Sequence, residues 1–292
     1  MIPAMDLRGA FLELVVGRLD PALRARVEWR LAARRGDVVP HILDALVRPN
    51  GVAVDIGASW GLFTYRLAEL AGEGGRVHAF EPNPANERSL RSITSRAGTV
   101  RFHRCALSEV PGSAELRVPR RRGRPVVGMG TLTVAPKRAP LFTDVVEVDV
   151  MRLDDALDDD VDRVDFIKCD VEGHEVDVLR GAERALASRP TLLIEIEQRH
   201  QDRDINATFE RLRERGYDGY AVRPRGLRPL DEFDVRRDQT TLVDPSALEP
   251  IVPPSYVHDF LFVAAGVDVS SLMGPAAVES EASNRSPSSR QS

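Results

Sequence analysis

The segment FIKCDVEGHE, residues 166–175, places ionisable side chains directly after a short apolar run. Asp170, Glu172 and His174 are its groups best suited to catalysis, because a histidine or a desolvated carboxylate can accept the proton of a hydroxyl. We predict His174 as a general base, with Glu172 as the second choice and Asp170 as a group that orients a cofactor or an acceptor. The competing interpretation is an ordinary helix N-terminus, where negative side chains are favourable.

A glycine turn follows an earlier apolar run, in VDIGASWG at residues 54–61. A dinucleotide fingerprint needs a second glycine two residues after the first, and Ser59 occupies that position. Asp55 beside the turn would repel a pyrophosphate and attract a cation. S-adenosylmethionine carries a sulfonium and an ammonium group and no phosphate, so the turn favours this cofactor over NAD. The predicted cofactor-binding residues here are Asp55, Gly57, Ser59 and Gly61. An ordinary glycine-rich turn is the alternative.

A second acidic residue ends the next apolar run, in RVHAFEP at residues 76–82. Glu81 comes twenty positions after Gly61, where an acidic side chain accepts hydrogen bonds from ribose hydroxyls. A carboxylate that stabilises the N-terminus of the following helix is the alternative. Acidic residues at two consecutive strand ends strengthen the prediction of an adenosyl cofactor.

Two further carboxylates lie in LLIEIEQRH, residues 192–200. Glu195 and Glu197 face the same side of an apolar strand, and a buried carboxylate is costly unless it is paired or functional. Lys168 is the expected structural partner of Glu195. These carboxylates, with Asp170, Glu172 and His174, also suit Mg²⁺, which prefers oxygen ligands. Nothing in their spacing demands a metal, so Mg²⁺ is possible but not favoured, and we predict no metal ligand.

Strand and helix patterns alternate from about residue 50, which predicts an α/β fold with a mainly parallel sheet covered by helices on both faces. Ligands of such sheets bind at the carboxyl ends of the strands. We predict an N-terminal helical extension over 1–48 and the main domain over 49–268. Within it, residues 108–150 read as an inserted hairpin or substrate loop. Residues 269–292 read as a disordered tail.

Composition excludes several classes of protein. A net charge of −5 and a pI near 5.8 make nucleic-acid binding unlikely. The N-terminal residues do not read as a signal peptide, and we expect no membrane span because no apolar run is long enough. Cys105 and Cys169 indicate no disulfide framework, so we expect a cytoplasmic protein.

Two segments have open roles. VPRRRGRP, residues 118–125, reads as a solvated basic loop or as a clamp for an anionic acceptor. The N-terminal helices either cap the pocket or form a dimer surface, so an oligomer is possible.

Six segments together resemble the FkbM-type methyltransferases, a branch of the class I S-adenosylmethionine-dependent family. The matching segments are VDIGASWGLFT (54–64), AFEPNP (79–84), CALSE (105–109), LDDAL (153–157), VDFIKCDVEGHEVDVLRGA (164–182) and LLIEIE (192–197). The resemblance covers about residues 50–200, and KCDVEGHE with the following VLRGA is its most specific part.

The resemblance implies a Rossmann-like, seven-stranded, mostly parallel sheet that ends in an antiparallel hairpin. It implies O-methylation of a hydroxyl on a sugar, glycolipid, polysaccharide or polyketide-type natural product. It places Asp55 and Gly57 at the methionine end of the cofactor, Glu81 on the ribose and Ala106 near the adenine. The chain departs from the family at Ser59, where Asn is common, and at Trp60, where a small or aliphatic residue is usual.

Two other functions compete with this hypothesis. An N-methyltransferase, including one acting on RNA bases, is disfavoured because the fourth strand end lacks an N-P-P-Y-type motif. A non-catalytic adenosyl-binding protein is the alternative from another class.

Overall fold

The computed structural model describes residues 19–121, 124–125, 130–132, 143–157, 161–224, 226–243 and 252–270. The N-terminal 18 residues and the tail predicted to be disordered, from residue 271 onward, lie outside this part of the chain. So do the four arginine side chains of the basic segment 118–125.

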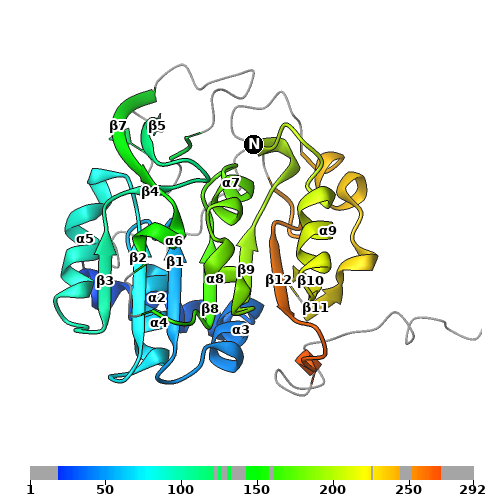
Figure 1. Cartoon of the computed structure of the whole chain (residues 1–292), viewed down its shortest axis with the longest axis horizontal. Helices are drawn as coiled ribbons and strands as arrows, with labels where there is room; N and C mark the ends of the chain where they lie inside the picture. Colours follow the sequence, from blue (N-terminus) through cyan, green and yellow to red (C-terminus); the bar gives the residue numbers. More distant parts are fainter. Residues whose placement is uncertain are drawn as a thin grey trace, which may run out of the picture.

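A mostly parallel sheet forms the centre of the fold, with strand order β11-β10-β12-β9-β8-β1-β2-β3 (Figure 1). Its strands are β1 (Val52–Ile56), β2 (Arg76–Phe80), β3 (Val100–His103), β8 (Phe166–Cys169), β9 (Thr191–Glu195), β10 (Tyr217–Arg223), β11 (Gly226–Pro229) and β12 (Asp259–Ala264). The central strands β1 and β8 are buried along almost their whole length, as expected for parallel strands covered on both faces. The predicted α/β class I methyltransferase fold is confirmed.

The predicted antiparallel hairpin is formed by β10 and β12, and β12 also pairs antiparallel with β9. The short strand β11 extends the edge of the sheet beyond the seven predicted strands. Because β12 runs against its neighbours, its first residue, Asp259, lies opposite Glu195 at the end of β9.

Helices cover both faces of the sheet. One face carries α2 (Pro21–Arg34), α3 (Val38–Leu46), α4 (Leu62–Ala71) and α5 (Pro84–Thr94). The other carries α6 (Leu153–Ala156), α7 (Glu175–Arg180), α8 (Glu183–Ala187) and α9 (Asn206–Glu214). Alternate residues of each strand point to opposite faces of the sheet, so Ile167 packs with the second group of helices and Phe166 with the first. No helix in the described ranges is both long enough and apolar enough to cross a membrane.

The predicted N-terminal helices are α2 and α3. Asp20 caps α2 by accepting from the backbone N–H of Ala22 at 3.1 Å, and Pro21 follows at the first helical position. The chain turns at Gly36, whose φ is +79°, before Asp37 caps α3.

The two stretches of alternating polarity between 108 and 150 form strands β5 (Gly112–Arg121) and β7 (Thr143–Met151), which pair antiparallel. With β4 (Ala106–Leu107) and β6 (Arg124–Pro125) they make a second sheet of order β4-β7-β5-β6. Figure 1 shows β5 and β7 rising beside the ends of the central strands.

Two predicted elements are divided in the structure. The single strand expected over 100–107 ends at His103, because its partner β2 ends at Phe80 and offers no further ladder. The helix expected after His174 breaks at Gly181, where a Cβ would lie 2.2 Å from the carbonyl oxygen of Ser108. Asp154 of α6 then accepts from the first backbone N–H groups of α8 and starts a new helix.

Candidate active site

A cleft lies at the carboxyl ends of β1, β2 and β8, between these strands and the second sheet. Most of the predicted site residues line it, namely Gly57, Ser59, Glu81, Ala106, Asp170, Glu172 and His174. Apolar side chains such as Leu107, Leu116 and Leu132 close the side formed by the second sheet. The cleft therefore combines an apolar wall with a polar edge, as ligand sites commonly do.

Gly57 follows β1 and lies against the backbone at the end of β8. Its φ is +78°, and a Cβ there would lie 1.8 Å from the carbonyl oxygen of Asp170. The backbone N–H groups of Gly57 and Ala58 donate to the carbonyl of Phe80 on β2. Only glycine fits this turn, which leaves a concave backbone surface open to a ligand.

Asp55 and Gly61 do not line the cleft in the part of the chain that is described. Asp55 is fully buried and accepts a 2.6 Å hydrogen bond from Thr64 Oγ1 of α4, while burial raises the pKa of its carboxyl to about 6. Gly61 begins α4 with φ +103°, and a Cβ there would lie 2.4 Å from Ile93 Cδ1. Both residues therefore stabilise the turn through contacts with α4 and α5, away from the cleft.

Glu81 presents its carboxylate to the cleft at the end of β2. Its two oxygens accept from the backbone N–H groups of Ser59 and Asn83, each at 2.8 Å. Burial raises the pKa of this carboxyl, and the two backbone hydrogen bonds oppose that rise. Each carboxylate oxygen has two lone pairs, so Glu81 keeps the capacity to accept from ligand hydroxyls.

The end of β8 carries a buried ion pair. Lys168 Nζ lies 3.2 Å from Asp170 Oδ2, and the Lys168 side chain is 3% exposed. The expected partner, Glu195, instead has its direct ion pair with His258 Nδ1 at 3.3 Å and acts on Lys168 only through longer-range attraction. Asp170 therefore lines the cleft as a carboxylate whose charge is balanced by Lys168.

The turn after Asp170 holds Glu172 in a strained backbone conformation, with φ +51° followed by Gly173 at +103°. The buried carboxylate of Glu175 fixes this turn by accepting from Val171 N at 3.3 Å and Gly173 N at 2.9 Å. Thr131 Oγ1, from the insertion, donates to the carbonyl of Glu172 at 2.9 Å. Both sides of the turn are thus restrained.

Glu172 points its carboxylate toward a group of like charges. Burial, together with repulsion from Asp170, Glu195 and Glu197, raises the pKa of Glu172 to about 8. Such a carboxyl can both release and accept a proton near neutral pH.

His174 lines the cleft, but both of its ring nitrogens already have neighbours. Nε2 lies 2.9 Å from Ser108 Oγ, and Nδ1 lies 3.5 Å from Asp177 Oδ2. Desolvation by burial lowers the pKa of the imidazole and keeps it neutral at neutral pH. A ring held by Ser108 and Asp177 is less available to a ligand than the Glu172 carboxylate.

The family model of the methyltransferase FkbM domain matches residues 46–218, more than half of the chain. The protein belongs to the FkbM methyltransferase family. The match begins at the end of α3, so α2 lies outside it.

This FkbM methyltransferase is similar to two named methyltransferases. It is 28% identical over 180 residues to the hexuronic acid methyltransferase AglP of Haloferax volcanii, a match that covers 61% of this chain and 69% of AglP. It is 31% identical over 159 residues to Methyltransferase 1 of Beauveria bassiana, covering 50% of this chain and 61% of that protein. The structure of precorrin-6y C5,15-methyltransferase from Geobacter metallireducens aligns with 78% of this chain and 88% of its own, at 16% identity and a TM-score of 0.40. That level of likeness assigns no activity.

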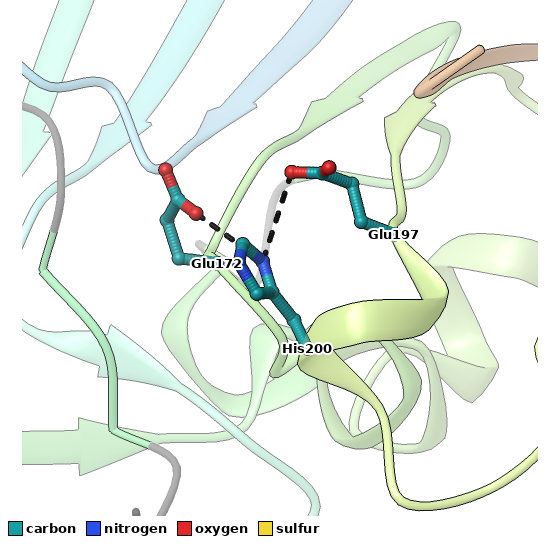
Figure 2. Close-up of side chains that lie close together, drawn as sticks. All are labelled: Glu172, Glu197 and His200. Carbon is teal, nitrogen blue, oxygen red and sulfur yellow. Dashed lines mark ion pairs between the residues drawn. The ribbon is translucent and has the colours of Figure 1, made fainter. Parts of the chain in front are cut away.

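His200 lies beside Glu172 in this FkbM methyltransferase, and the sequence analysis did not single it out. Its ring lies between two carboxylates, with Nδ1 3.4 Å from Glu172 Oε2 and 3.8 Å from Glu197 Oε1 (Figure 2). Desolvation lowers the pKa of His200, so the ring is neutral near pH 7. The signal was present, since His200 ends the segment LLIEIEQRH. The strand, however, stops at Glu195, and a 3₁₀ turn (η1, Gln198–His200) brings the ring next to Glu172.

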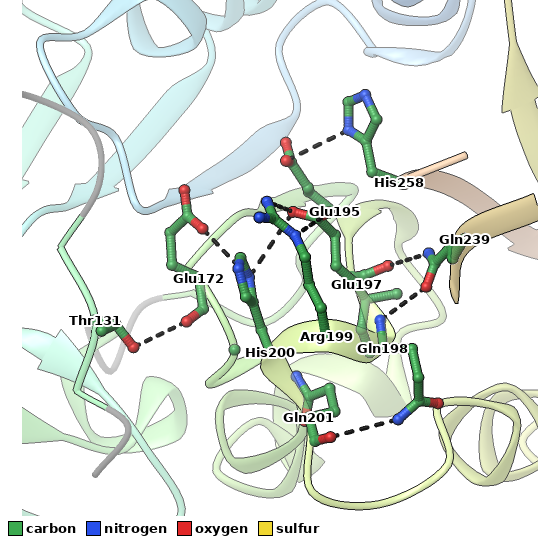
Figure 3. Close-up of polar contacts among 12 residues, drawn as sticks. Thr131, Glu172, Glu195, Glu197, Gln198, Arg199, His200, Gln201, Gln239 and His258 are labelled. Carbon is green, nitrogen blue, oxygen red and sulfur yellow. Dashed lines mark hydrogen bonds and ion pairs between the residues drawn. The ribbon is translucent and has the colours of Figure 1, made fainter. Parts of the chain in front are cut away.

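The η1 turn is held by neighbours distant in sequence (Figure 3). The side chain of Gln239, fully buried in the π-helix η3 (Arg236–Thr240), accepts from Gln198 N at 2.7 Å and donates to the carbonyls of Ile196 and Val257. Gln201 Nε2 donates to Glu175 at 2.6 Å. His200 is therefore placed by rigid contacts with η3 and with the turn after β8.

Glu172, Glu197 and His200 lie close enough together to hold a metal ion. Arg199, however, donates to both oxygens of Glu197 at 2.7 Å, from Nε and Nη2. This bidentate pair already supplies the positive charge that a metal would bring. This first donor set therefore gives no ground for a metal. A second described group, Glu195, His258 and Asp259, also lies close enough together to hold an ion, so the sequence prediction of no metal ligand stays a prediction.

Proposed function

We propose that this FkbM methyltransferase transfers the methyl group of S-adenosylmethionine to a hydroxyl of a sugar, a glycolipid or a polyketide-type natural product. One observation carries the proposal: three groups line the same cleft. They are the glycine turn at Gly57, the carboxylate of Glu81, which can accept hydrogen bonds from hydroxyls, and the carboxylate of Glu172, which can accept a proton. The first two groups suit an adenosyl cofactor, and the third suits a hydroxyl acceptor.

The cleft residues fit the cofactor. Glu81 would accept hydrogen bonds from the ribose hydroxyls, and Ala106 with its apolar neighbours would pack against the adenine. Asp170 and the backbone at Gly57 would face the methionine end, with Ser59 beside them. Asp55 and Gly61 would act indirectly, by fixing the turn through Thr64 and α5. When bound, S-adenosylmethionine supplies an electrophilic methyl group on a positively charged sulfur.

We assign the role of general base to Glu172 and keep His174 as the second choice. As the acceptor oxygen bonds to the methyl carbon, its proton passes to the Glu172 carboxylate, and the electrons of the broken carbon–sulfur bond stay with sulfur. His200 Nδ1, 3.4 Å away, is placed to share that proton with Glu172. Glu197, itself paired with Arg199, lies 3.8 Å from the same ring nitrogen.

A sugar-type acceptor is supported by two observations. The relative AglP is named as a hexuronic acid methyltransferase. The edge of the site formed by β8, β9 and β12 also carries several carboxylates, which are good acceptors for the hydroxyls of a polyol. We propose that residues 49–268 carry the activity, that the insertion 108–150 faces the acceptor, and that 1–48 is an accessory extension.

Calorimetric titration with S-adenosylmethionine, S-adenosylhomocysteine and NAD tests the cofactor. Micromolar binding of the two adenosyl compounds and no binding of NAD would support the proposal. A folded sample that binds neither adenosyl compound would overturn it.

Incubation with methyl-labelled S-adenosylmethionine and a panel of glycans and hydroxylated natural products tests the reaction, with the label located by mass spectrometry. Glycans that contain hexuronic acid belong in that panel, and the E172Q variant is its control. Label on nitrogen, or no transfer to any hydroxyl despite cofactor binding, would speak for one of the alternative functions.

A further inference from the structure

Two aromatic side chains form one wall of the cofactor cleft. Trp60 stands in the glycine turn after β1, and Phe63 stands in the first turn of α4. The backbone of Trp60 is fixed because its carbonyl accepts a 2.8 Å hydrogen bond from Ser89 Oγ of α5. Nothing in the turn itself, however, fixes the orientation of the Trp60 ring.

The ring of Trp60 is covered by a residue of α2. Arg24 Cζ lies 4.0 Å from the centroid of the Trp60 ring, well within the range of a cation–π interaction. Arg24 is in turn oriented by Glu28, one helical turn later, whose Oε1 accepts from Arg24 Nε at 2.8 Å. One side of the indole therefore packs against a fixed cation.

The same helix supports the second aromatic residue. Trp29 packs edge-on against Phe63, with ring centroids 5.7 Å apart and an interplanar angle of 81°. Trp29 is buried, and Phe63 also contacts the charged end of Lys168, whose Nζ lies 4.9 Å from the Phe63 centroid. Helix α2 thus contacts the cleft wall at two points.

Helix α2 is also tied firmly to the main domain. Asp20, its capping residue, lies 2.7 Å from Arg96 Nη1 and accepts from Ser92 Oγ at 3.3 Å, both beside or within α5. Figure 1 shows α2 next to α4 in the layer of helices on that face of the sheet. The family match begins only at residue 46, so this support is supplied by an element outside the matched domain.

We propose that α2 is a structural part of the cofactor site, in which Arg24 positions the ring of Trp60 and thereby sets the affinity for the adenosyl cofactor. This inference rests on the proposed function. Arg24 is a positioning residue, because it acts on the cofactor through Trp60. This role of Arg24 also explains how a ring as large as that of Trp60 is kept in a defined orientation at a turn position where the family usually has a small or aliphatic residue.

Calorimetry with S-adenosylhomocysteine on four proteins tests the proposal: the wild type, R24A, R24K and R26A. A cation–π contact of this kind corresponds to a loss of affinity of about 3- to 30-fold in R24A. R24K keeps a cation and is expected to recover part of the affinity. Arg26 is exposed on the same helix and carries the same charge, so R26A is expected to bind like the wild type.

The fluorescence emission of Trp60 is a second measurement. It should not change on substitution of Arg24 if α2 only stabilises the fold. The chain has 2 tryptophans, so W29F leaves Trp60 as the only one. Binding of S-adenosylhomocysteine is expected to change the Trp60 emission of W29F. In the double variant W29F/R24A, we expect the emission of the ligand-free protein to be shifted and the emission change on binding to be smaller.

The outcomes separate the inference from the proposed function. Wild-type protein that binds S-adenosylhomocysteine while R24A binds equally well would overturn the inference and leave the proposed function standing. Wild-type protein that binds no adenosyl compound would overturn the proposed function itself. If R24A does not fold, W60L at the turn replaces it, and unchanged binding by W60L would also overturn the inference.

Discussion

Thr131 Oγ1 donates a 2.9 Å hydrogen bond to the backbone carbonyl of Glu172, and this contact joins the inserted second sheet to the turn that carries the proposed base. Glu172 adopts φ +51°, a conformation that a side-chain-bearing residue keeps only when its surroundings hold it. The insertion therefore contributes to the geometry of the proposed base as well as facing the proposed acceptor.

The T131V variant removes this hydrogen bond at nearly constant volume. We expect the rate constant of methyl transfer to fall by about 3- to 10-fold, since a net hydrogen bond contributes about 0.5–1.5 kcal/mol. Binding of S-adenosylhomocysteine should stay unchanged, because Thr131 does not contact the glycine turn at Gly57. T94V is the matched control, since Thr94 Oγ1 bonds a carbonyl at 3.1 Å on the exposed face of α5. Equal rates for T131V and wild type would show that the turn holds its shape without the insertion.

The E172Q variant tests the general base directly. A positioned base contributes about 10²- to 10⁴-fold to the rate, so a loss of that size is expected with little change in cofactor binding. Because the base must be deprotonated and burial raises its pKa to about 8, the wild-type rate should rise with pH through about 8. E172Q should lose this rise. The rival assignment is tested by H174N: a large loss in H174N beside a small one in E172Q would move the role to His174.

Glu172 should also make stability depend on pH. A carboxyl whose pKa is about 8 in the folded protein and near 4.5 when unfolded favours the folded state at low pH and loses that contribution as pH rises through 8. Each unit of difference between the folded and unfolded pKa corresponds to about 1.4 kcal/mol. The free energy of unfolding of the wild type should therefore fall from pH 5 to pH 9, and that of E172Q should rise relative to it over the same range. Urea unfolding at these two pH values measures the change. E73Q, at an exposed glutamate, should show no such trend.

Gly57 should tolerate no side chain. In G57A the new methyl group would lie 1.8 Å from the Asp170 carbonyl, at a backbone conformation that alanine disfavours. We expect the free energy of unfolding to fall by more than about 3 kcal/mol, together with a loss of S-adenosylhomocysteine binding. Gly98 has open space around its Cβ position, and G98A should change stability by less than about 0.5 kcal/mol. Thermal unfolding and calorimetry of the two variants make the comparison, and a stable G57A that binds the ligand would contradict it.

The sequence was sufficient to predict the features that depend on local pattern. Apolar runs that end in Asp55, Glu81 and Asp170 mark strand ends, and parallel strands bring such ends to one edge of a sheet. Gly57 was recognisable because a tight turn between strand and helix has a strong local signature. These residues lie at the predicted edge, although Asp55 turns inward to Thr64.

Contacts between distant segments were beyond this reasoning. Lys168 was expected to pair with Glu195 because their strands are neighbours. In the structure Lys168 pairs with Asp170, two residues further along the chain, and Glu195 pairs with His258. His258 could not be anticipated, because it reaches the site only through the reversed direction of β12. His200 was missed because its position depends on a 3₁₀ turn held by Gln239, whose partners lie tens of residues away.

The placement of β12 between β9 and β10 affects how the chain must fold as it is synthesised. Residues 259–264 are made last among the described strands, yet they fill an internal place in the sheet and bridge β9 to β10. Until they emerge from the ribosome, β9 is an open edge next to the unfinished site, and such edges invite wrong pairing. Pairing of β12 with β9 and β10 thus comes late, and the edge of the sheet that carries the proposed site is complete only after β12 has been translated.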